Sequence, residues 1–294
     1  MLRRILLASA GAMALAGTAI AADMPVAPPP PPPPLWTSFY IGVNAGGTWG
    51  NNNSVNTATA NLDPGNGLGN EAVYNVASAG LATTNISPQT TAFIGGGQIG
   101  YNYQFANSWL VGIEADIQGV SKNGPTTLFN QTTVIAGEAL IQSALASKSM
   151  DYFGTVRGRI GFLATPTLLV YGTGGLAYGG IHSSTLIGQA IAGAPAVPNL
   201  YSAFGSVSNT RVGWTAGGGV EWLFLPHWSV KLEYLYYDLG SVTYGLGPLA
   251  NFNTGGTLFT LGAPVSRTHF NGNIVRAGVN YHFNWGAPPV VARY

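Results

Sequence analysis

One segment of strand length, ANSWLVGIEADIQGV at residues 106–120, constrains the fold more than any other part of the sequence. Its apolar residues fall on every second position, and Glu114, Asp116 and Gln118 occupy positions between them. Successive side chains of a β-strand point to opposite faces, so the pattern predicts a strand with one apolar and one polar face. Charged residues make up only 7% of the 294-residue chain, against roughly 25% in ordinary soluble domains. The charged, solvated surface of a soluble domain is therefore missing.

The same alternation recurs along most of the chain, in segments close to the ~9 to 11 residues that cross a bilayer as a tilted strand. The segment that starts at Leu168 is apolar on both faces, and the others separate an apolar from a polar face. The eight predicted strands are 39–49, 93–105, 106–120, 151–162, 168–179, 211–224, 228–237 and 273–283.

The connections between these segments alternate between short and long. Tight turns are predicted at 106–108, 164–167 and 225–227, and long polar loops rich in Gly, Asn, Thr and Ser at 50–91, 121–149, 181–210 and 240–269. Short turns at one end and long loops at the other are typical of outer-membrane barrels. We therefore expect an all-β, eight-stranded antiparallel up-and-down transmembrane barrel with short periplasmic turns, long extracellular loops and both termini on the periplasmic side.

Aromatic residues gather beside the predicted short turns, where a girdle at one membrane interface is expected. The predicted girdle consists of Phe39, Phe105, Trp109, Phe162, Phe224, Trp228 and Phe283.

The charged residues of the strands share the polar face. An eight-stranded barrel encloses an interior just wide enough for side chains to fill it, and a Lys or Arg that faces lipid costs ~2 to 4 kcal/mol. We therefore predict that four acids and four bases pair inside the barrel, set its register and fill its lumen. The predicted lumen charge network is Glu114, Asp116, Arg157, Arg159, Glu221, Lys231, Glu233 and Arg276.

The N-terminal region has the charged start, apolar core and small residues of a secretory signal peptide, here 1–21 with cleavage after Ala21 or Ala22. A retained membrane helix is the alternative. Residues 22–37 form a proline-rich periplasmic linker, stiff because proline fixes φ, although a docking motif is conceivable. The barrel domain is expected at 38–284 and a C-terminal tail at 285–294.

Several stretches give the chain a resemblance to a known family. AADMP after the signal, WTSFYIGVNAGGTWG, YGTGGLAYG, WSVKLEYLYYDLG and NIVRAGVNYHF resemble the alphaproteobacterial Omp25/Omp31-like outer-membrane proteins, over most of the chain outside the long loops. The resemblance implies a Gram-negative outer-membrane location after Sec export, contact with lipid and lipopolysaccharide, and roles in envelope integrity and surface recognition. It also implies that the barrel assembly machinery reads the last strand, with Tyr281 and Phe283, although many barrels end on that aromatic and here a tail follows.

No enzyme, cofactor or metal site is predicted. Glu114 and Asp116 are favoured as ion-paired residues over a catalytic carboxylate pair. Ser183 and Ser184 lie beside His182, but adjacency in sequence is no catalytic geometry. The four histidines are scattered singly and show no metal-ligand spacing. The resemblance suggests haem or iron-source binding at the loops, which would use His182 or His269. The four histidines are His182, His227, His269 and His282.

Composition also limits the partners. A net charge of +1 gives no basic patch for nucleic acid, and the absence of cysteine excludes disulfides and thiolate chemistry. The leading expectation is a structural and surface-recognition barrel with a possible extracellular ligand at its loops. A small porin that passes ions or small solutes is the alternative, and an exported β-sandwich such as a lectin is the third.

Overall fold

The computed structural model describes residues 35–62, 71–121, 126–135, 137–192, 201–252 and 258–283. Internal contacts separate residues 1–33 from residues 34–294, and every described residue belongs to the second unit. The expected signal peptide, the linker up to residue 34 and the tail at 285–294 lie outside the described residues. Within the described ranges, no helix combines the length and the hydropathy needed to span a membrane.

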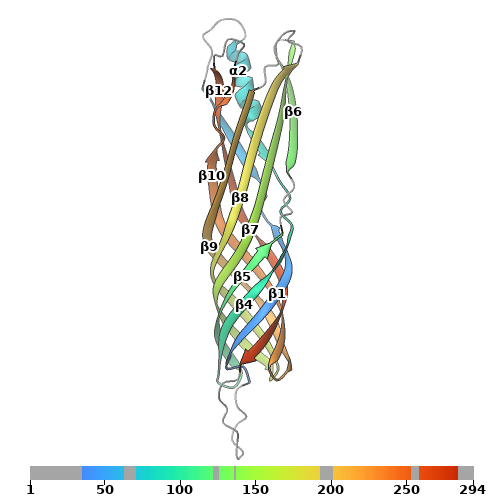
Figure 1. Ribbon diagram of the computed structural model, residues 1–294, viewed down its shortest axis with the longest axis vertical. Coiled ribbons are helices and arrows are strands. Elements are labelled where there is room, and N and C mark those ends of the chain that lie inside the picture. The colour runs from blue at the N-terminus through green and yellow to red at the C-terminus, as the bar shows by residue number, and fades with distance from the viewer. Residues whose placement is uncertain are drawn as a thin grey trace, which may run out of the picture. The chain divides into compact units, whose positions relative to one another are not determined.

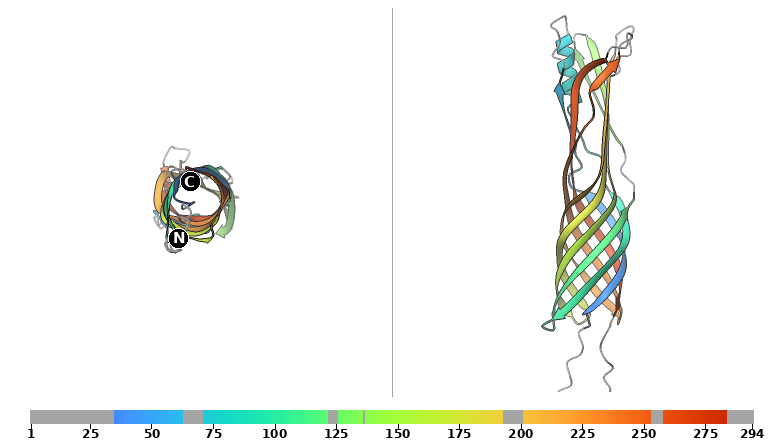
Figure 2. Two further views of the ribbon diagram at one scale, coloured as in Figure 1. Left: turned by 90° about the horizontal axis from the view of Figure 1, so that it is seen from below. Right: turned by 60° about the vertical axis from the view of Figure 1, so that its left-hand side comes forward.

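Eight strands of the described part form a closed antiparallel ring (Figure 1). The ring follows chain order, and β1 pairs with β12 to close it, with Phe39 opposite Phe283. Seen along the strands, the ring surrounds a single interior (Figure 2). This confirms the up-and-down barrel predicted from the sequence. The ring strands are β1 (Ser38–Gly50), β4 (Ala92–Phe105), β5 (Trp109–Val120), β7 (Glu138–Thr165), β8 (Leu168–Ala192), β9 (Tyr201–Leu225), β10 (Trp228–Gly245) and β12 (Leu258–Phe283).

The period-two pattern separates the two faces of the ring. On β5, Val111, Ile113 and Ile117 are 40% to 56% exposed, whereas Glu114 and Asp116 are 2% and 5% exposed. Soluble proteins rarely expose an apolar surface that continues around the whole molecule. Such a surface suits a hydrocarbon surrounding, in which the closed ring also satisfies every backbone group of its strands.

Short turns join the strands at one end of the ring, which we call the short-turn end. Residues 106–108 connect β4 to β5, residues 166–167 connect β7 to β8, and residues 226–227 connect β9 to β10. Ala106 and Asn107 adopt positive φ values of 47° and 62°, a left-handed conformation that lets the chain reverse within so few residues.

At the opposite end of the ring, which we call the long-strand end, the prediction of long polar loops is wrong: the ring strands continue there. β7 has 28 residues, and at roughly 3.3 Å per residue it is about 90 Å long, far more than the ~25 Å apolar band of a barrel. Beyond the band, Ala144 and Ala146 are fully buried, while Ser143 and Ser147 face outward. A strand that is covered by water on one side carries polar residues there, so its composition resembles that of a loop.

Shorter elements complete the extension at the long-strand end (Figures 1 and 2). β2 pairs with β12 and β3, and β6 pairs with β7. Tyr74 and Gln142 fasten the helix. The single hydroxyl hydrogen of Tyr74 is shared between Ile135 O at 3.0 Å and Glu138 Oε2 at 2.9 Å, and Gln142 Nε2 donates to Leu81 O at 2.6 Å. The elements are β2 (Val55–Asn61), α2 (Glu71–Ala82), β3 (Thr84–Ile86), β6 (Thr127–Ile135) and β11 (Leu249–Phe252).

The interior is arranged in layers, which can be followed along β7 from Leu163 at the short-turn end, through the charged Arg159 and Arg157, to Phe153 and then Ala146. The lower plug is Trp36, Leu110, Leu163, Leu169, Tyr171 and Leu223. The middle plug is Ile94, Val120, Met150, Phe153, Ala177, Ile181, Leu235, Tyr237, Leu239, Val242, Phe270 and Ile274. The upper core is Val55, Ala82, Ile86, Ala144, Ala146, Ile187, Ala203, Tyr244, Leu246, Leu249 and Leu261.

Candidate functional site

The charged layer between the lower and middle plugs is the candidate site, and strand register brings its members together. Each charged residue lies on the inward face of its strand, and antiparallel pairing places residues of opposite charge side by side on neighbouring strands. These adjacent pairs are Glu114 with Arg157, Lys231 with Glu221, and Glu233 with Arg276.

Arg157 connects opposite sides of the ring. Its Nη2 atom lies 2.5 Å from Glu114 Oε1 and 3.0 Å from Asp116 Oδ2. Its Nη1 atom reaches Glu233 Oε1 at 3.0 Å. The planar guanidinium offers several donors in fixed directions, so one arginine can satisfy acids from both walls. Glu114 and Asp116 are on β5, and Glu233 is on β10, so the contacts close the middle of the lumen.

Two further cations share the same acids. Arg276 Nη2 lies 2.6 Å from Glu233 Oε2 and 2.8 Å from Asp116 Oδ2. Lys231 Nζ donates to both carboxylate oxygens of Glu114 at 2.8 and 2.9 Å. Each of these three acids therefore has at least two cationic neighbours, so its negative charge is balanced by more than one side chain.

Glu221 forms a second centre, nearer the short-turn end. Arg159 Nη2 lies 3.0 Å from Glu221 Oε2. The other oxygen, Oε1, accepts hydrogen bonds from Ser229 Oγ at 2.6 Å and Asn280 Nδ2 at 2.7 Å, and His282 Nε2 lies 3.5 Å away. The predicted network thus extends to neutral residues that complete its hydrogen bonds.

Tyrosines that were missed at the sequence level also belong to this layer. Tyr40 donates to Glu114 Oε2 at 2.6 Å, and Tyr171 donates to Glu233 Oε1 at 3.0 Å. Arg159 lies between their rings, 5.1 Å from one centroid and 5.0 Å from the other. Both tyrosines occupy inward-facing positions of their strands, which was the only signal in the sequence for this role. Their aromatic rings gave no reason to expect them in a charge network.

The side chains of the charged layer fill the lumen and leave no water-filled channel at this level. A water-filled channel would leave the side chains that line it exposed, whereas all eight predicted residues are at most 5% exposed. The exposed fractions are Glu114 2%, Asp116 5%, Arg157 1%, Arg159 4%, Glu221 0%, Lys231 1%, Glu233 2% and Arg276 1%. The structure therefore places every predicted member of the network in one buried cluster.

Trp36 closes the short-turn end. Its side chain is fully buried in the lower plug, and its indole Nε1 donates to Pro166 O at 3.0 Å. The ring packs edge-on against His282 at 5.8 Å. The sequence had placed this residue in the linker, and only its position two residues after the proline run could have drawn attention to it.

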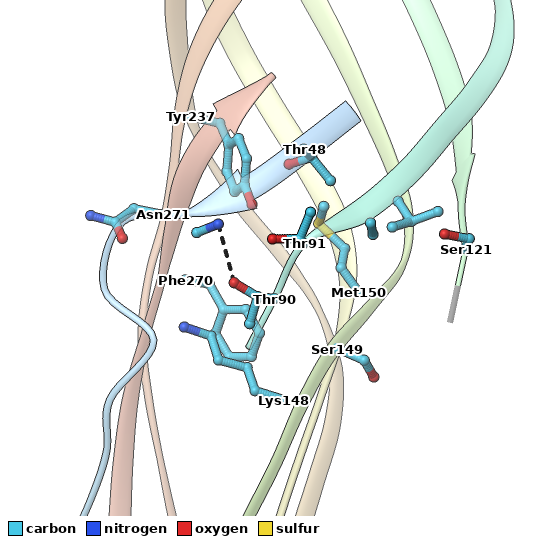
Figure 3. A pocket seen from close by; sticks show the side chains of 13 residues that line it. Thr48, Thr90, Thr91, Ser121, Lys148, Ser149, Met150, Tyr237, Phe270 and Asn271 are labelled. Atoms are coloured by element: carbon cyan, nitrogen blue, oxygen red, sulfur yellow. Dashed lines mark hydrogen bonds between the residues drawn. The ribbon is translucent and has the colours of Figure 1, made fainter. Parts of the chain in front are cut away.

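The middle plug closes the other side of the charged layer. Phe153 and Tyr237 stack with ring centroids 5.0 Å apart. A cavity of about 40 Å³ lies beside this plug (Figure 3), large enough for ordered water but not for a solute. Both sides of the charged layer are therefore covered by apolar groups.

Lys148, on β7, lines the same cavity (Figure 3). It is 3% exposed, and its Nζ donates to Asn52 O at 2.7 Å and His269 O at 2.6 Å. The ammonium also lies 4.6 Å from the centroid of the Phe270 ring. Burial lowers the pKa of Lys148 to about 8, because desolvation disfavours the charged form.

The predicted aromatic girdle lies on the outer face near the short-turn end. Trp109 and Phe162 face each other across β5 and β7 with centroids 5.5 Å apart. A second belt, missed from the sequence, includes Trp49, Phe93 and Trp214. The eleven residues from Phe39 to Trp49 span about 25 Å along the axis at a tilt of about 40°, the height of an apolar band. The exposed fractions are Phe39 59%, Phe105 38%, Trp109 45%, Phe162 46%, Phe224 43% and Trp228 43%, and Phe283 is partly exposed.

Other candidate chemistry is dispersed. Ser183 Oγ donates to Ser147 O at 3.0 Å, and Ser184 Oγ lies 2.7 Å from Ser147 Oγ, so the hydroxyls beside His182 are engaged elsewhere. His227 is in a short turn. Among the described residues, no three histidines, cysteines or acids group in a way that would hold a metal ion.

Comparison with known proteins gives one family match. Residues 6–283 match the family described as outer membrane protein beta-barrel domain. The chain is 34% identical over 289 residues to the 31 kDa outer-membrane immunogenic protein of Brucella melitensis biotype 1, which covers 96% of this chain and 100% of that protein. The protein of the same name from Brucella suis biovar 1 has the same identity and coverage.

Two more distant similarities are one relative in sequence and one solved structure. The 22 kDa outer membrane protein of Rhizobium leguminosarum bv. viciae is 29% identical over 181 residues, which are 61% of this chain and 65% of that protein. The outer membrane protein OprG from Pseudomonas aeruginosa is 13% identical with a TM-score of 0.41, over 85% of this chain and 98% of that one.

Proposed function

Since the chain belongs to the outer membrane protein β-barrel family and resides in the outer membrane of a Gram-negative cell, we propose that it is a closed barrel that supports the envelope and presents its extended strands at the cell surface. The single observation that carries the proposal is the buried charged layer between two apolar plugs. Its side chains take the space that a solute would need. The short-turn end is then periplasmic and the long-strand end extracellular.

The charged layer serves register and closure in this proposal. Buried ion pairs add little net stability because desolvation offsets their attraction, but an unpaired member is costly. A strand that slips by one residue would turn its charged residue towards lipid and break several contacts at once. The layer therefore favours one register and one strand order.

The small porin is the competing function, and single-channel recording in planar bilayers separates the two. We expect no stepwise conductance from the folded protein. The double variant Arg157→Ala/Glu114→Ala removes one charge of each sign and hollows the layer, so we expect it to conduct more than the parent. The matched control Val156→Ala/Ile113→Ala trims outward-facing residues of the same two strands and should stay silent. Stepwise conductance from the unaltered protein would support the porin.

The surface role rests on the long strands beyond the apolar band. The Brucella relatives are named immunogenic, and we extend surface exposure to this chain. Because the sequence has no cysteine, single introduced cysteines report position cleanly. On intact cells, an impermeant maleimide should label Gln131→Cys in β6 and spare Thr167→Cys in the short turn, although both side chains are exposed. The reverse labelling pattern would contradict the orientation.

The expected partners of the protein follow from its location in the outer membrane. The apolar outer face is covered by lipid, with lipopolysaccharide in the outer leaflet. We also propose that the barrel assembly machinery inserts the chain and that the strand around Tyr281 and Phe283 is its signal. Replacing both aromatics with alanine should lower the amount of folded protein in outer membranes more than replacing the outward Val275 and Val279 does.

A further inference from the structure

The outward-facing surface just above the outer aromatic belt holds a serine, a histidine and an aspartate that strand geometry brings together. β10 contains a bulge between Asp238 and Ser241, where its register with β12 shifts, and Gly240 has a φ of +78°. In a regular strand two residues three apart point to opposite faces. The bulge adds one residue to β10 and so reverses the alternation of inward and outward side chains. Asp238 and Ser241 therefore both face outward, beside His269, the cross-strand partner of Ser241.

These three side chains form one continuous line of contacts. Ser241 Oγ lies 2.9 Å from His269 Nδ1, and His269 Nε2 lies 3.1 Å from Asp238 Oδ2. A carboxylate can only accept a hydrogen bond, so the neutral ring carries its proton on Nε2 and donates it to Asp238. Nδ1 is then the lone-pair nitrogen that accepts the hydroxyl proton of Ser241. Acid, imidazole and hydroxyl follow one another in the order that activates a serine nucleophile, with the two ring nitrogens exchanged relative to the Ser-His-Asp triad, in which Nε2 faces the serine and Nδ1 the acid.

The backbone holds the line in place. The other oxygen of Asp238, Oδ1, accepts a hydrogen bond from Gly240 N at 2.8 Å. Arg211 Nη2 donates to Ser241 O at 3.1 Å. The acid is thus oriented by its own turn and the serine by a neighbouring strand, which leaves the hydroxyl and the imidazole aligned.

A polar groove of about 450 Å³ opens onto the serine and the histidine. Ser241, His269 and Arg267 line it, together with Asn52, Ser54 and Asn271. The side chains of His269 and Asp238 are 29% and 22% exposed, so the site is accessible. Arg267 lies on the same outward face of β12 and brings a positive charge to the groove.

The position of the groove indicates its substrate. Trp214 is the cross-strand partner of Asp238 and stacks on Tyr236 with centroids 5.4 Å apart, so the outer aromatic belt lies directly against the site. Aromatic belts mark the boundary between acyl chains and headgroups, where lipid carboxylic esters are found. An outward site at this level meets lipid from the outer leaflet, and Arg267 suits an anionic headgroup.

We propose that Ser241, His269 and Asp238 form a hydrolytic site for carboxylic esters of anionic lipids in the outer leaflet. Ser241 Oγ attacks the ester carbonyl carbon while His269 Nδ1 takes the hydroxyl proton; the bond to the alcohol oxygen breaks, and His269 gives that proton to the departing alcohol. Water then attacks the acyl-serine, His269 accepts a proton from the water, and Ser241 regains a proton as the fatty acid leaves. Asp238 is a positioning residue that orients the imidazole. The activity goes beyond the structural role and departs from the expectation of a non-enzyme.

The test uses the full folded barrel in detergent micelles and a fluorophosphonate probe, which bonds covalently to activated serines. Mass spectrometry should find the probe on Ser241. Labelling and hydrolysis of p-nitrophenyl butyrate should each fall about a hundredfold or more in Ser241→Ala and in His269→Ala, and the double variant should lose no more than the single ones, because the residues act as a unit. The control Thr243→Ala changes a neighbouring outward residue and should behave like the parent. Heat-modifiable gel migration shows that every variant is folded.

A second arm identifies the substrate. Vesicles of phosphatidylglycerol or of lipopolysaccharide should release fatty acid in the presence of the barrel, and Arg267→Gln should slow that release more than it slows hydrolysis of the uncharged p-nitrophenyl butyrate. Hydrolysis of the soluble ester without release from either phosphatidylglycerol or lipopolysaccharide would overturn the lipid assignment. Absence of probe on Ser241 in the folded parent, or equal labelling in His269→Ala, would overturn the site and leave these contacts as a purely structural cross-strand cluster.

Discussion

Replacing Arg157 with leucine probes the charged layer at its most connected member. The substitution keeps a side chain of moderate volume in the lumen but removes the guanidinium that contacts Glu114, Asp116 and Glu233 at 2.5, 3.0 and 3.0 Å. The layer then holds one negative charge more than its cations balance. Breaking a buried ion pair by removing one partner typically costs ~3 to 5 kcal/mol.

The remaining contacts set the expected magnitude within that range. After the substitution, Lys231 still lies 2.8 Å from Glu114, and Arg276 still contacts Asp116 and Glu233. Each acid therefore keeps at least one cation, and we expect a loss near the lower end, about 3 kcal/mol. Against a net stability of ~5 to 15 kcal/mol, the variant should fold and show a clearly lower unfolding midpoint.

Urea unfolding in lipid vesicles, followed by tryptophan fluorescence and heat-modifiable gel migration, measures this loss. Val156→Leu changes the adjacent outward-facing residue and should shift the free energy of unfolding by less than about 0.5 kcal/mol. Adding Glu114→Gln to Arg157→Leu restores the charge balance and should recover about 1 kcal/mol or more. If Arg157→Leu unfolds at the same urea concentration as Val156→Leu, the charged layer contributes nothing to stability and the reasoning is refuted.

Three further predictions concern other parts of the molecule. Trp36→Ala opens the lower plug and should lower the free energy of unfolding by about 3 kcal/mol in the same assay, whereas an unchanged midpoint would mean that the side chain is not buried there. Tyr74→Phe removes the hydroxyl that links α2 to Ile135 and Glu138 of the β6–β7 hairpin and should speed protease cleavage in α2 without moving the barrel midpoint; equal cleavage rates would argue against that anchor. Because burial lowers the pKa of Lys148 to about 8 while an unfolded lysine titrates near ~10.4, the unfolded chain binds more protons between those values. Stability should therefore rise as the pH increases from about 8 to about 10, and the rise should vanish in Lys148→Met; an identical pH dependence in both proteins would exclude the effect.

The strand pattern allowed the membrane-spanning ring to be predicted, because lipid on one side and a narrow lumen on the other impose a strict alternation. Val111 and Glu114 could each be assigned to a face from parity alone. Parity says nothing about height along the barrel, however. The apolar Phe153 and Leu110 share the inward face with Arg157, and only the three-dimensional register shows that they form plugs on either side of the charged layer.

The extracellular extension could not be predicted because its strands are covered by water. Ser143 and Ser147 face outward where a membrane strand would carry valine or isoleucine, so the alternation of β7 fades beyond Met150 although the strand continues. The cluster of Ser241, His269 and Asp238 depends on a bulge at Gly240, which changes the phase of β10. No periodic pattern reveals such a change, so Ser241 and His269 were assigned to the polar loop 240–269, and Asp238 fell between that loop and the strand predicted at 228–237.

The central claim is that bulk water does not reach the charged layer of the folded barrel. Ser229 is fully buried and donates to Glu221 Oε1 at 2.6 Å, and the chain has no cysteine of its own. The direct measurement is the rate at which a small, charged thiol reagent modifies Ser229→Cys in the folded protein, relative to Thr167→Cys in the exposed turn. A closed barrel predicts modification of Ser229→Cys only after unfolding in urea. Equal rates for the two cysteines in the folded state would show a water-filled lumen and contradict the account.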